Sequence, residues 1–149
     1  MVLTGGVRAG RAVLRELAGR LVPAIMELSG SDAVFVLPGA DLEIVAKSLA
    51  WGLTLNAGAT CIAPRRVFAP RDAMPALHDK LRPLIGRLKP QPVAKAAAEN
   101  AIRLAEDAMK AGARPLLPWP TPSADASFPP LVLTGAGPGM ALLREDVFA

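Results

Sequence analysis

Short apolar segments alternate along this chain with longer segments of helical periodicity, and Gly or Pro stands at most of the changes between them. The strand-like runs at residues 2–4 and 33–37, for example, each lead through glycine into a helix pattern. Parallel strands need crossover connections, and a helix is the usual crossover. The alternation therefore predicts an α/β fold, with a mostly parallel sheet and helices packed on it.

The amino-acid composition agrees with a compact protein of this class. A length of 149 residues suits one domain of ordinary size, and 52% hydrophobic with 20% charged residues excludes a disordered chain. Aromatic residues make up only 4%, and tyrosine is absent. The core must therefore consist of Ala, Val, Leu and Ile, which favour close packing of helices on a sheet.

The run of residues 33–37 is continuously apolar between Asp32 and Pro38, which predicts a central strand covered on both faces. Six prolines between residues 115 and 130 predict an irregular loop. Shorter apolar runs predict further strands at residues 2–4, 24–26, 65–69, 116–117 and 131–134, and a last strand-like run from Met140.

Four segments have the periodicity and boundary residues of helices. Asp41 is a suitable N-cap for one of them, which should bury Ile44, Val45, Leu49 and Trp51. The expected helices span residues 7–20, about 41–55, 71–88 and 93–111.

Charge and rare residues exclude several classes of function. The net charge is +4, but the 17 basic residues are spread along the chain without aromatic stacking positions, so we expect no nucleic-acid partner. One cysteine and one histidine exclude an internal disulfide and a metal cluster, and we expect His78 to lie in solvent. No apolar run is long enough to cross a bilayer, and the first residues lack the pattern of a signal peptide. We therefore expect a cytoplasmic protein without membrane contact.

Glu27, in a turn rich in Gly and Ser, and the lone Cys61 are the candidate reactive residues. A thiolate is a good nucleophile, and a covalent thiol intermediate needs a base that activates the water releasing it. The pair suggests acyl chemistry. Taken alone, however, a single cysteine is more often a buried inert thiol, and Glu27 would be a solvated turn residue.

Five segments, in order, make the chain resemble the aldehyde dehydrogenase superfamily over nearly all of its length. Residues 3–10 are similar to the family's FTGSxxxG turn, 26–30 to its ELGG motif, 36–42 to its ADL step, 55–61 to its FxNxGQxC segment and 144–148 to the start of REEIFGPV. Each match is weak by itself. Their common order and spacing make the resemblance strong.

The resemblance implies that Cys61 attacks an aldehyde to give a thiohemiacetal, that hydride passes to NAD or NADP, and that Glu27 is the general base for hydrolysis of the resulting thioester. The backbone N–H of Cys61 would supply one oxyanion donor. The same resemblance implies that Gly5, Gly6, Leu28 and Asp146 are positions that bind the cofactor, and it implies no metal.

Four positions depart from the family pattern. Gly6 stands where the family has a serine that touches the cofactor phosphate, so only backbone N–H groups could serve there. Ala59 replaces a glutamine and Ser29 a glycine. Asp146 is one methylene shorter than the family's glutamate, and at this place in the chain it is equally a candidate surface charge.

Family members are several times longer than this chain, so the resemblance implies a piece truncated at both ends. We expect residues 1–21 to be the remnant of a dinucleotide-binding domain and residues 22–149 to be a partial catalytic domain. Activity of such a piece should be impaired or absent. The alternative is a non-catalytic interaction module that pairs with a full dehydrogenase chain. In either case we expect a homo-oligomer or association through exposed apolar surface.

Overall fold

The computed structural model describes residues 1–119 and 127–147, and these divide into two compact units. The first unit is residues 1–30, and the second begins at Ser31. The division follows Gly30, whereas the sequence suggested a boundary after residue 21. A compact unit is not by itself a functional domain, so the assignment of cofactor and catalytic parts stays a prediction.

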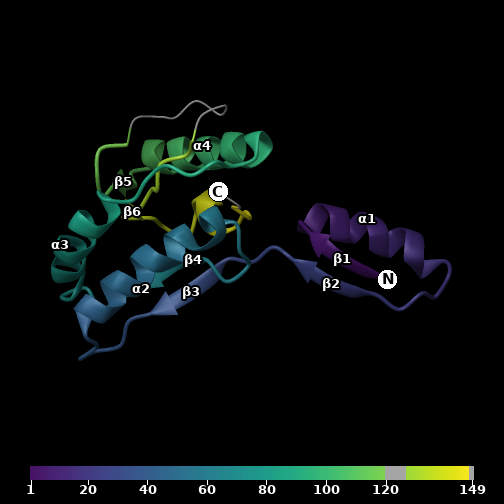
Figure 1. Cartoon of the computed structure of the whole chain (residues 1–149), viewed down its shortest axis with the longest axis horizontal. Helices are drawn as coiled ribbons and strands as arrows, with labels where there is room; N and C mark the ends of the chain where they lie inside the picture. Colours follow the sequence, from purple (N-terminus) through teal and green to yellow (C-terminus); the bar gives the residue numbers. More distant parts are fainter. Residues whose placement is uncertain (120–126, 148–149) are drawn as a thin grey trace. The chain divides into compact units, whose positions relative to one another are not determined.

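The first unit is a strand, a helix and a second strand. β1 (Val2–Gly5) pairs in parallel with β2 (Ile25–Leu28), and α1 (Val7–Ala18) is the crossover between them (Figure 1). The helix lies close to the second strand, because a Cβ at Gly10 would stand 2.8 Å from the Cδ2 of Leu28. The expected strand at residues 24–26 is present and extends to Leu28.

The second unit repeats this plan on a larger scale. β3 (Asp32–Phe35) pairs in parallel with β4 (Pro64–Phe68), and α2 (Leu42–Thr54) followed by the short 3-10 turn η1 (Leu55–Gly58) connects them. The remaining elements in chain order are α3 (Met74–Ile85), α4 (Lys95–Lys110), β5 (Arg114–Pro115), β6 (Leu133–Thr134) and the 3-10 turn η2 (Ala141–Leu143).

The predicted α/β class is confirmed, although the strands are not joined into one sheet. The described strands form three two-stranded sheets, of which β1–β2 and β3–β4 are parallel and β5–β6 is antiparallel. The four expected helices are all present. Of the expected proline-rich loop, residues 120–126 lie outside the described residues.

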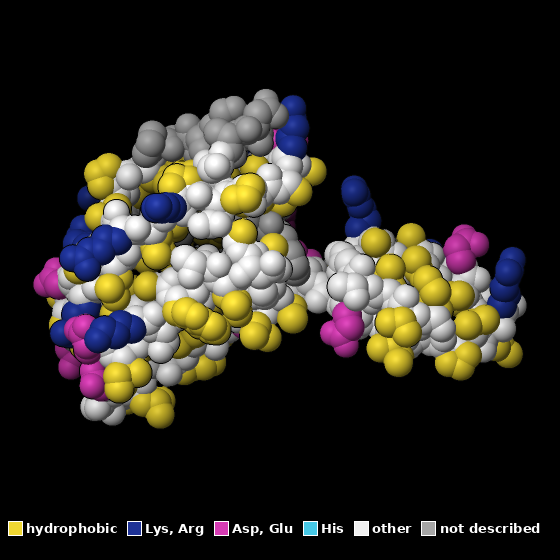
Figure 2. Space-filling view, viewed as in Figure 1, with side chains coloured by type: hydrophobic (Ala, Val, Ile, Leu, Met, Phe, Trp, Pro, Cys, Tyr) yellow, Lys and Arg dark blue, Asp and Glu magenta, His cyan; other side chains and the backbone are white. Residues whose placement is uncertain are grey.

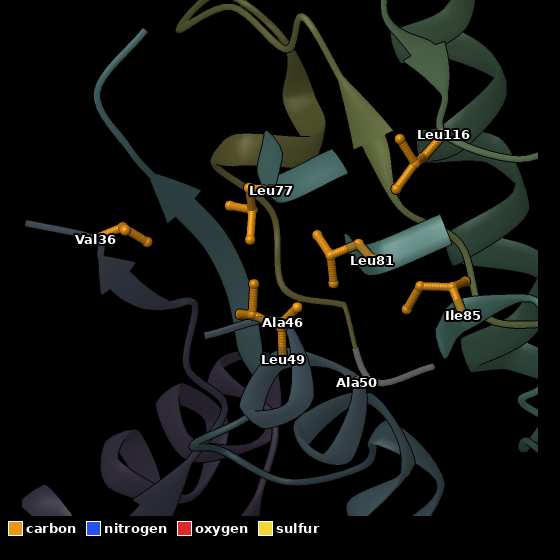
Figure 3. Packing of buried hydrophobic residues seen from close by; sticks show 8 residues of the cluster. All are labelled: Val36, Ala46, Leu49, Ala50, Leu77, Leu81, Ile85 and Leu116. Carbon is orange, nitrogen blue, oxygen red and sulfur yellow. The ribbon is translucent and has the colours of Figure 1, made fainter. Parts of the chain in front are cut away.

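The main core lies in the second unit, between α2, α3 and the two strands that α2 connects (Figure 3). Leu77 on α3 is 1% exposed and packs with Leu81 and Ile85 against Ala46 and Leu49 of α2. A smaller cluster joins α4 to the segment around Phe128 through Ala98 and Ala101. The cores consist mainly of Ala, Leu and Val, as the composition predicted.

The start and the last turn of α2 are each fixed by a specific interaction. Asp41 caps the helix as predicted, because its carboxylate accepts hydrogen bonds from the backbone N–H groups of Glu43 at 2.8 Å and Ile44 at 3.3 Å. Further along, a Cβ at Gly52 would stand 2.7 Å from the Cγ of Pro64. The missing side chain therefore allows α2 to lie against the beginning of β4.

Several burial predictions are wrong, because residues that were expected to be buried are exposed. Phe35 and Leu37 are each 69% exposed, so the strand predicted to be covered on both faces has one open face, on which Phe35 stacks against Phe68 at 5.2 Å between ring centroids. Ile44 and Trp51 were expected inside and are exposed as well. Figure 2 shows such hydrophobic side chains on the visible face of each unit. Apolar character alone does not say whether a covering layer is present.

Two element predictions near the C-terminus are also corrected. The short strand expected at residues 116–117 is observed at Arg114–Pro115, because it pairs with β6 there. The strand-like run from Met140 forms the 3-10 turn η2 instead of a strand. No described strand lies beside this run to accept its backbone hydrogen bonds.

Replacing Gly52 by Ala should destabilise the second unit. Alanine favours a helix by about 1 kcal/mol over glycine, but the overlap with the rigid ring of Pro64 should cost about 1–3 kcal/mol, and we expect a net loss. This loss in the free energy of unfolding is measured by urea unfolding, with circular dichroism as the signal. Ser48→Ala, at an exposed position of the same helix, is the control and should be nearly neutral. A more stable Gly52→Ala variant would contradict the close approach of α2 and β4.

Candidate active site

Cys61 lies on a short loop that leads from the end of α2 into β4. After α2 the chain turns through three residues in the left-handed region, with φ of 49° at Asn56, 55° at Ala57 and 76° at Gly58. The Asn56 side-chain amide donates to the carbonyl of Ala59 at 2.9 Å, and the Ala59 N–H donates to the carbonyl of Asn56 at 3.0 Å. The loop is thus closed on itself just before Cys61.

A partly buried arginine ties this loop to the sheet. The guanidinium of Arg65, in β4, donates to the carbonyl of Gly58, and its neighbour Arg66 donates to the carbonyl of Ser31 at the start of β3. Burial lowers the pKa of Arg65 below its ordinary value, which lies so far above neutrality that the group stays protonated at pH 7. A cationic donor therefore holds the turn that precedes Cys61.

Arg65 and Arg66, which were not among the candidate site residues, are both partly buried and bonded to backbone carbonyls. One signal was available. Adjacent strand residues point to opposite faces, so two consecutive arginines in a strand cannot both lie on one solvated face.

The thiol of Cys61 is exposed, which does not fit the alternative of a buried inert cysteine. Ile62, the next residue, is exposed too. An accessible sulfur on a short, hydrogen-bonded loop is an arrangement that a nucleophile requires. Its assignment as the nucleophile remains a prediction.

Four of the other predicted site residues lie in the first unit. Glu27 is exposed in β2, directly across from Thr4 of β1 in the strand register. Leu28, one residue further, contacts the helix at Gly10 with its side chain. Gly5 ends β1, and Gly6 is the N-cap residue of α1. Because Cys61 belongs to the second unit, the cooperation of Glu27 and Cys61 stays a prediction.

The beginning of α1 has the features of an anion-binding helix end. Gly6 provides no side-chain cap, so the backbone N–H groups of the first turn have no partner within the helix until Gly10 donates to the carbonyl of Gly6 at 3.0 Å. The first turn carries no acidic residue. A Cβ at Gly6 would meet nothing within 4 Å, so a phosphate group can approach the backbone there.

Asp146 is exposed and lies next to α4. Its backbone carbonyl accepts a hydrogen bond from the side chain of Asn100 at 3.2 Å, and the carboxylate of its neighbour Glu145 forms an ion pair with Arg103. These contacts place the residue beside α4 in the second unit, while Gly5 and Gly6 are in the first. Its predicted contact with the cofactor ribose is therefore still a prediction. Residue 148, the last of the matching motif, lies outside the described residues.

Other reactive groups are few. In the described part of the chain, no three His, Cys, Asp or Glu side chains come together as a metal site. Within the same residues, no helix is long and apolar enough to cross a membrane. His78 is partly buried on α3 and borders an apolar cavity, which corrects the expectation that it lies in solvent.

Changing Ala57 to Gly should stabilise the loop before Cys61. Ala57 has φ 55° and ψ 32°, a conformation that costs an L-residue with a Cβ about 1–2 kcal/mol and costs glycine little. Glycine also loses more backbone entropy on folding, which offsets part of this gain. We therefore expect the free energy of unfolding, measured in urea, to rise by about 0.5–1 kcal/mol. Ala59→Gly, at φ −86°, is the matched control and should lose stability. Equal effects of the two changes would contradict the left-handed turn.

Comparison with known proteins gives a consistent result. The family model "Aldehyde dehydrogenase family" matches residues 1–149. A succinate-semialdehyde dehydrogenase (NADP+) of Deinococcus radiodurans is 33% identical over 98% of this chain and 33% of its own length. A probable coniferyl aldehyde dehydrogenase of Caulobacter vibrioides is 28% identical over 99% of this chain and 33% of its own.

A solved structure shows the same similarity in three dimensions. The succinate-semialdehyde dehydrogenase of Burkholderia pseudomallei superposes with a TM-score of 0.85 at 26% identity, over 99% of this chain and 33% of that one. The chain thus spans about a third of the length of the relatives it matches.

Proposed function

The chain belongs to the aldehyde dehydrogenase family, and on that premise we propose that it carries the nucleophile of a site that oxidises an aldehyde to a carboxylic acid with NAD or NADP. The single observation that supports this most is the exposed thiol of Cys61, on a loop closed by Asn56 and tied to β4 by Arg65. Because the chain spans only a third of its relatives, this activity is proposed for the complete catalytic unit and is impaired or absent in the 149 residues alone.

In the proposed reaction the sulfur of Cys61 attacks the aldehyde carbon, and the carbonyl oxygen becomes an oxyanion. The backbone N–H of Cys61 donates one hydrogen bond to that oxyanion. The bound nicotinamide supplies the acceptor for the hydride that leaves the thiohemiacetal carbon. The product on Cys61 is then a thioester, at the oxidation level of the acid.

Glu27 is the proposed base for the second half of the reaction. Its carboxylate takes a proton from water, the resulting hydroxide attacks the thioester carbon, and the thiolate of Cys61 leaves as the carboxylic acid is released. Glu27 is exposed near the end of β2, so its carboxylate can contact water and residues from another part of the chain. One aldehyde, one water and one oxidised cofactor give one acid, one reduced cofactor and one proton.

The cofactor is proposed to bind at Gly5, Gly6, Leu28 and Asp146. The open N-terminus of α1 would hold the pyrophosphate through backbone N–H groups. Leu28 contributes its packing at Gly10, and Asp146 would accept from a ribose hydroxyl. The Deinococcus relative is named as an NADP+-dependent enzyme, which supports NADP as one of the two cofactors. In this proposal the dinucleotide-binding part is residues 1–21 and the partial catalytic part residues 22–149.

A cytoplasmic location and assembly into a homo-oligomer complete the proposal. The second candidate function, a non-catalytic module that pairs with a dehydrogenase chain, is favoured by the exposed apolar side chains of Phe35, Leu37 and Trp51. The two functions differ in whether the chemistry at Cys61 is needed.

The catalytic proposal can be tested in a chimera in which these 149 residues replace the matched third of the Deinococcus relative. With succinic semialdehyde and NADP+, we expect the chimera to form NADPH. Cys61→Ser should lower turnover by at least about a thousandfold, because the nucleophile is lost. Glu27→Gln should slow steady-state turnover by about 10²–10⁴-fold while keeping a burst of NADPH.

Glu16→Gln is the control for the second variant, since Glu16 is an exposed glutamate on α1 of the same unit. It should leave turnover unchanged. A chimera that folds and turns over equally well with Cys61→Ser would refute the proposed role of the sulfur. If the Glu27→Gln variant lost the burst of NADPH, Glu27 would be needed for NADPH formation, a step that precedes hydrolysis of the thioester.

Gly6→Ser in the same chimera should tighten cofactor binding. The space around Gly6 is open, and a serine hydroxyl at this N-cap position can donate to the phosphate, which is worth about 0.5–1.5 kcal/mol. We expect the KM for NADP+ to fall by about three- to tenfold. Gly19→Ser, at the other end of α1 and also in open space, is the control. An unchanged or raised KM for Gly6→Ser alone would place the phosphate elsewhere.

A further inference from the structure

The segment that carries Asp146 is attached to its surroundings at three successive positions. The carboxylate of Glu145 pairs with the guanidinium of Arg103, on α4, at 2.5 Å. The backbone carbonyl of Asp146 accepts a hydrogen bond from the side-chain amide of Asn100, on the same helix, at 3.2 Å. The side chain of Val147 packs against the smaller hydrophobic cluster, which includes residues of α4. Asp146 therefore lies between two residues whose side chains are held at this helix.

Arg103 connects the two polar attachments. Its Nη2 donates both to the Oε2 of Glu145 at 2.5 Å and to the Oδ1 of Asn100 at 2.8 Å. Residues 100 and 103 are three positions apart, so their side chains are neighbours on the surface of α4. The Nη1 of Arg103 lies 3.8 Å from the Oδ2 of Asp107, one turn further along the helix. The guanidinium is thus held on its own helix while it binds the segment.

The bond from Arg103 also orients the amide of Asn100. An asparagine amide has one accepting oxygen and one donating NH₂ group, whereas a guanidinium only donates and a backbone carbonyl only accepts. The amide oxygen therefore faces Arg103, and the NH₂ group faces the carbonyl of Asp146. Without the guanidinium, nothing in this network would favour that orientation over the reverse one. Arg103 acts on the backbone of Asp146 through Asn100 as well as through Glu145.

Backbone placement matters more for an aspartate than for a glutamate at this position. Asp146 is one methylene shorter than the family's glutamate, so it has one rotatable bond fewer with which to direct its carboxylate. The backbone before it is held by η2, because the N–H groups of Arg144 and Glu145 donate to the carbonyl of Ala141 at 2.9 and 2.8 Å. The α4 network holds the backbone at Asp146 itself. The position of the carboxylate then depends mainly on these attachments.

We propose that Arg103 is a positioning residue for the cofactor contact of Asp146. With Asn100 and Glu145 it holds the backbone so that the carboxylate of Asp146 can accept a hydrogen bond from a ribose hydroxyl. The inference rests on the proposed function, which assigns that contact to Asp146. Arg103 acts through the aspartate and touches neither the cofactor nor the aldehyde.

The expected effect is modest, because the network lies at the surface. The side chains of Arg103 and Glu145 are 48% and 47% exposed, and exposed ion pairs contribute little to global stability. Removal of the guanidinium should therefore leave the fold and the Tm nearly unchanged. It should increase local opening of the segment, which is the quantity to measure.

Hydrogen exchange of this chain tests the attachment. In Arg103→Met, we expect the backbone N–H groups of residues 143–145 to exchange about two- to fivefold faster, because the segment opens more often. Lys110→Met is the matched control, since Lys110 is an exposed cation of α4 that pairs with Asp107 at 3.5 Å. It should leave the exchange of residues 143–145 unchanged. Unchanged exchange in Arg103→Met would overturn the proposal.

The effect on the cofactor is measured as the Kd for NADP+ in the chimera, by isothermal titration calorimetry without aldehyde. Asp146→Ala should raise the Kd by about tenfold, because a charge-assisted hydrogen bond is lost. Arg103→Met should raise it by about two- to fivefold. Arg103→Lys keeps a cation that can donate to Glu145 and should recover most of the affinity. In the Asp146→Ala background, Arg103→Met should change the Kd by less than about 1.5-fold.

The outcomes separate this inference from the proposed function. If Asp146→Ala leaves the Kd for NADP+ unchanged, the assigned cofactor contact is wrong, and the positioning role of Arg103 fails with it. If Asp146→Ala raises the Kd but Arg103→Met does not, the contact stands and only the positioning role is wrong. An equal loss from Arg103→Met with and without the carboxylate of Asp146 would also overturn the inference, because the arginine would then act independently of the aspartate.

Discussion

The close contact between Gly52 of α2 and Pro64 of β4 fixes how this helix lies against the strand that follows it. Because position 52 has no side chain, the helix lies directly against the start of the strand, and a Cβ there would come within 2.7 Å of the proline ring. Near this contact, Leu49 of α2 packs with Leu77 and Leu81 of α3. The loop that carries Cys61 connects the two elements joined by this contact, so its ends are held close together.

The loop itself combines strain with strong local bonding. Asn56 and Ala57 adopt left-handed conformations that are unfavourable for residues with a Cβ, and they are held there by the side chain of Asn56 and by the partly buried guanidinium of Arg65. Backbone strain of this kind is common where a reactive group must be placed accurately. The result is an exposed sulfur on a well-connected turn.

The exposed apolar residues of the second unit share one explanation. Phe35, Leu37 and Phe68 are exposed on or next to the β3–β4 pair. A chain that matches a third of its relatives has surfaces that, in a longer chain, further segments can cover. Burial of this apolar area would stabilise such an assembly by about 25 cal/mol for each Å² removed from water.

The sequence by itself determined the local features whose causes lie within a few residues. The alternation of strands and helices predicted the α/β class, Asp41 predicted the start of α2, and five motifs in common order established the family resemblance. These features follow from backbone periodicity and capping, which depend on neighbours along the chain. Only the tertiary structure decided that Trp51 and Phe35 are exposed and that Arg65 is partly buried and bonded to the carbonyl of Gly58. Burial depends on which distant segments cover a side chain, and no local pattern of residues contains that information.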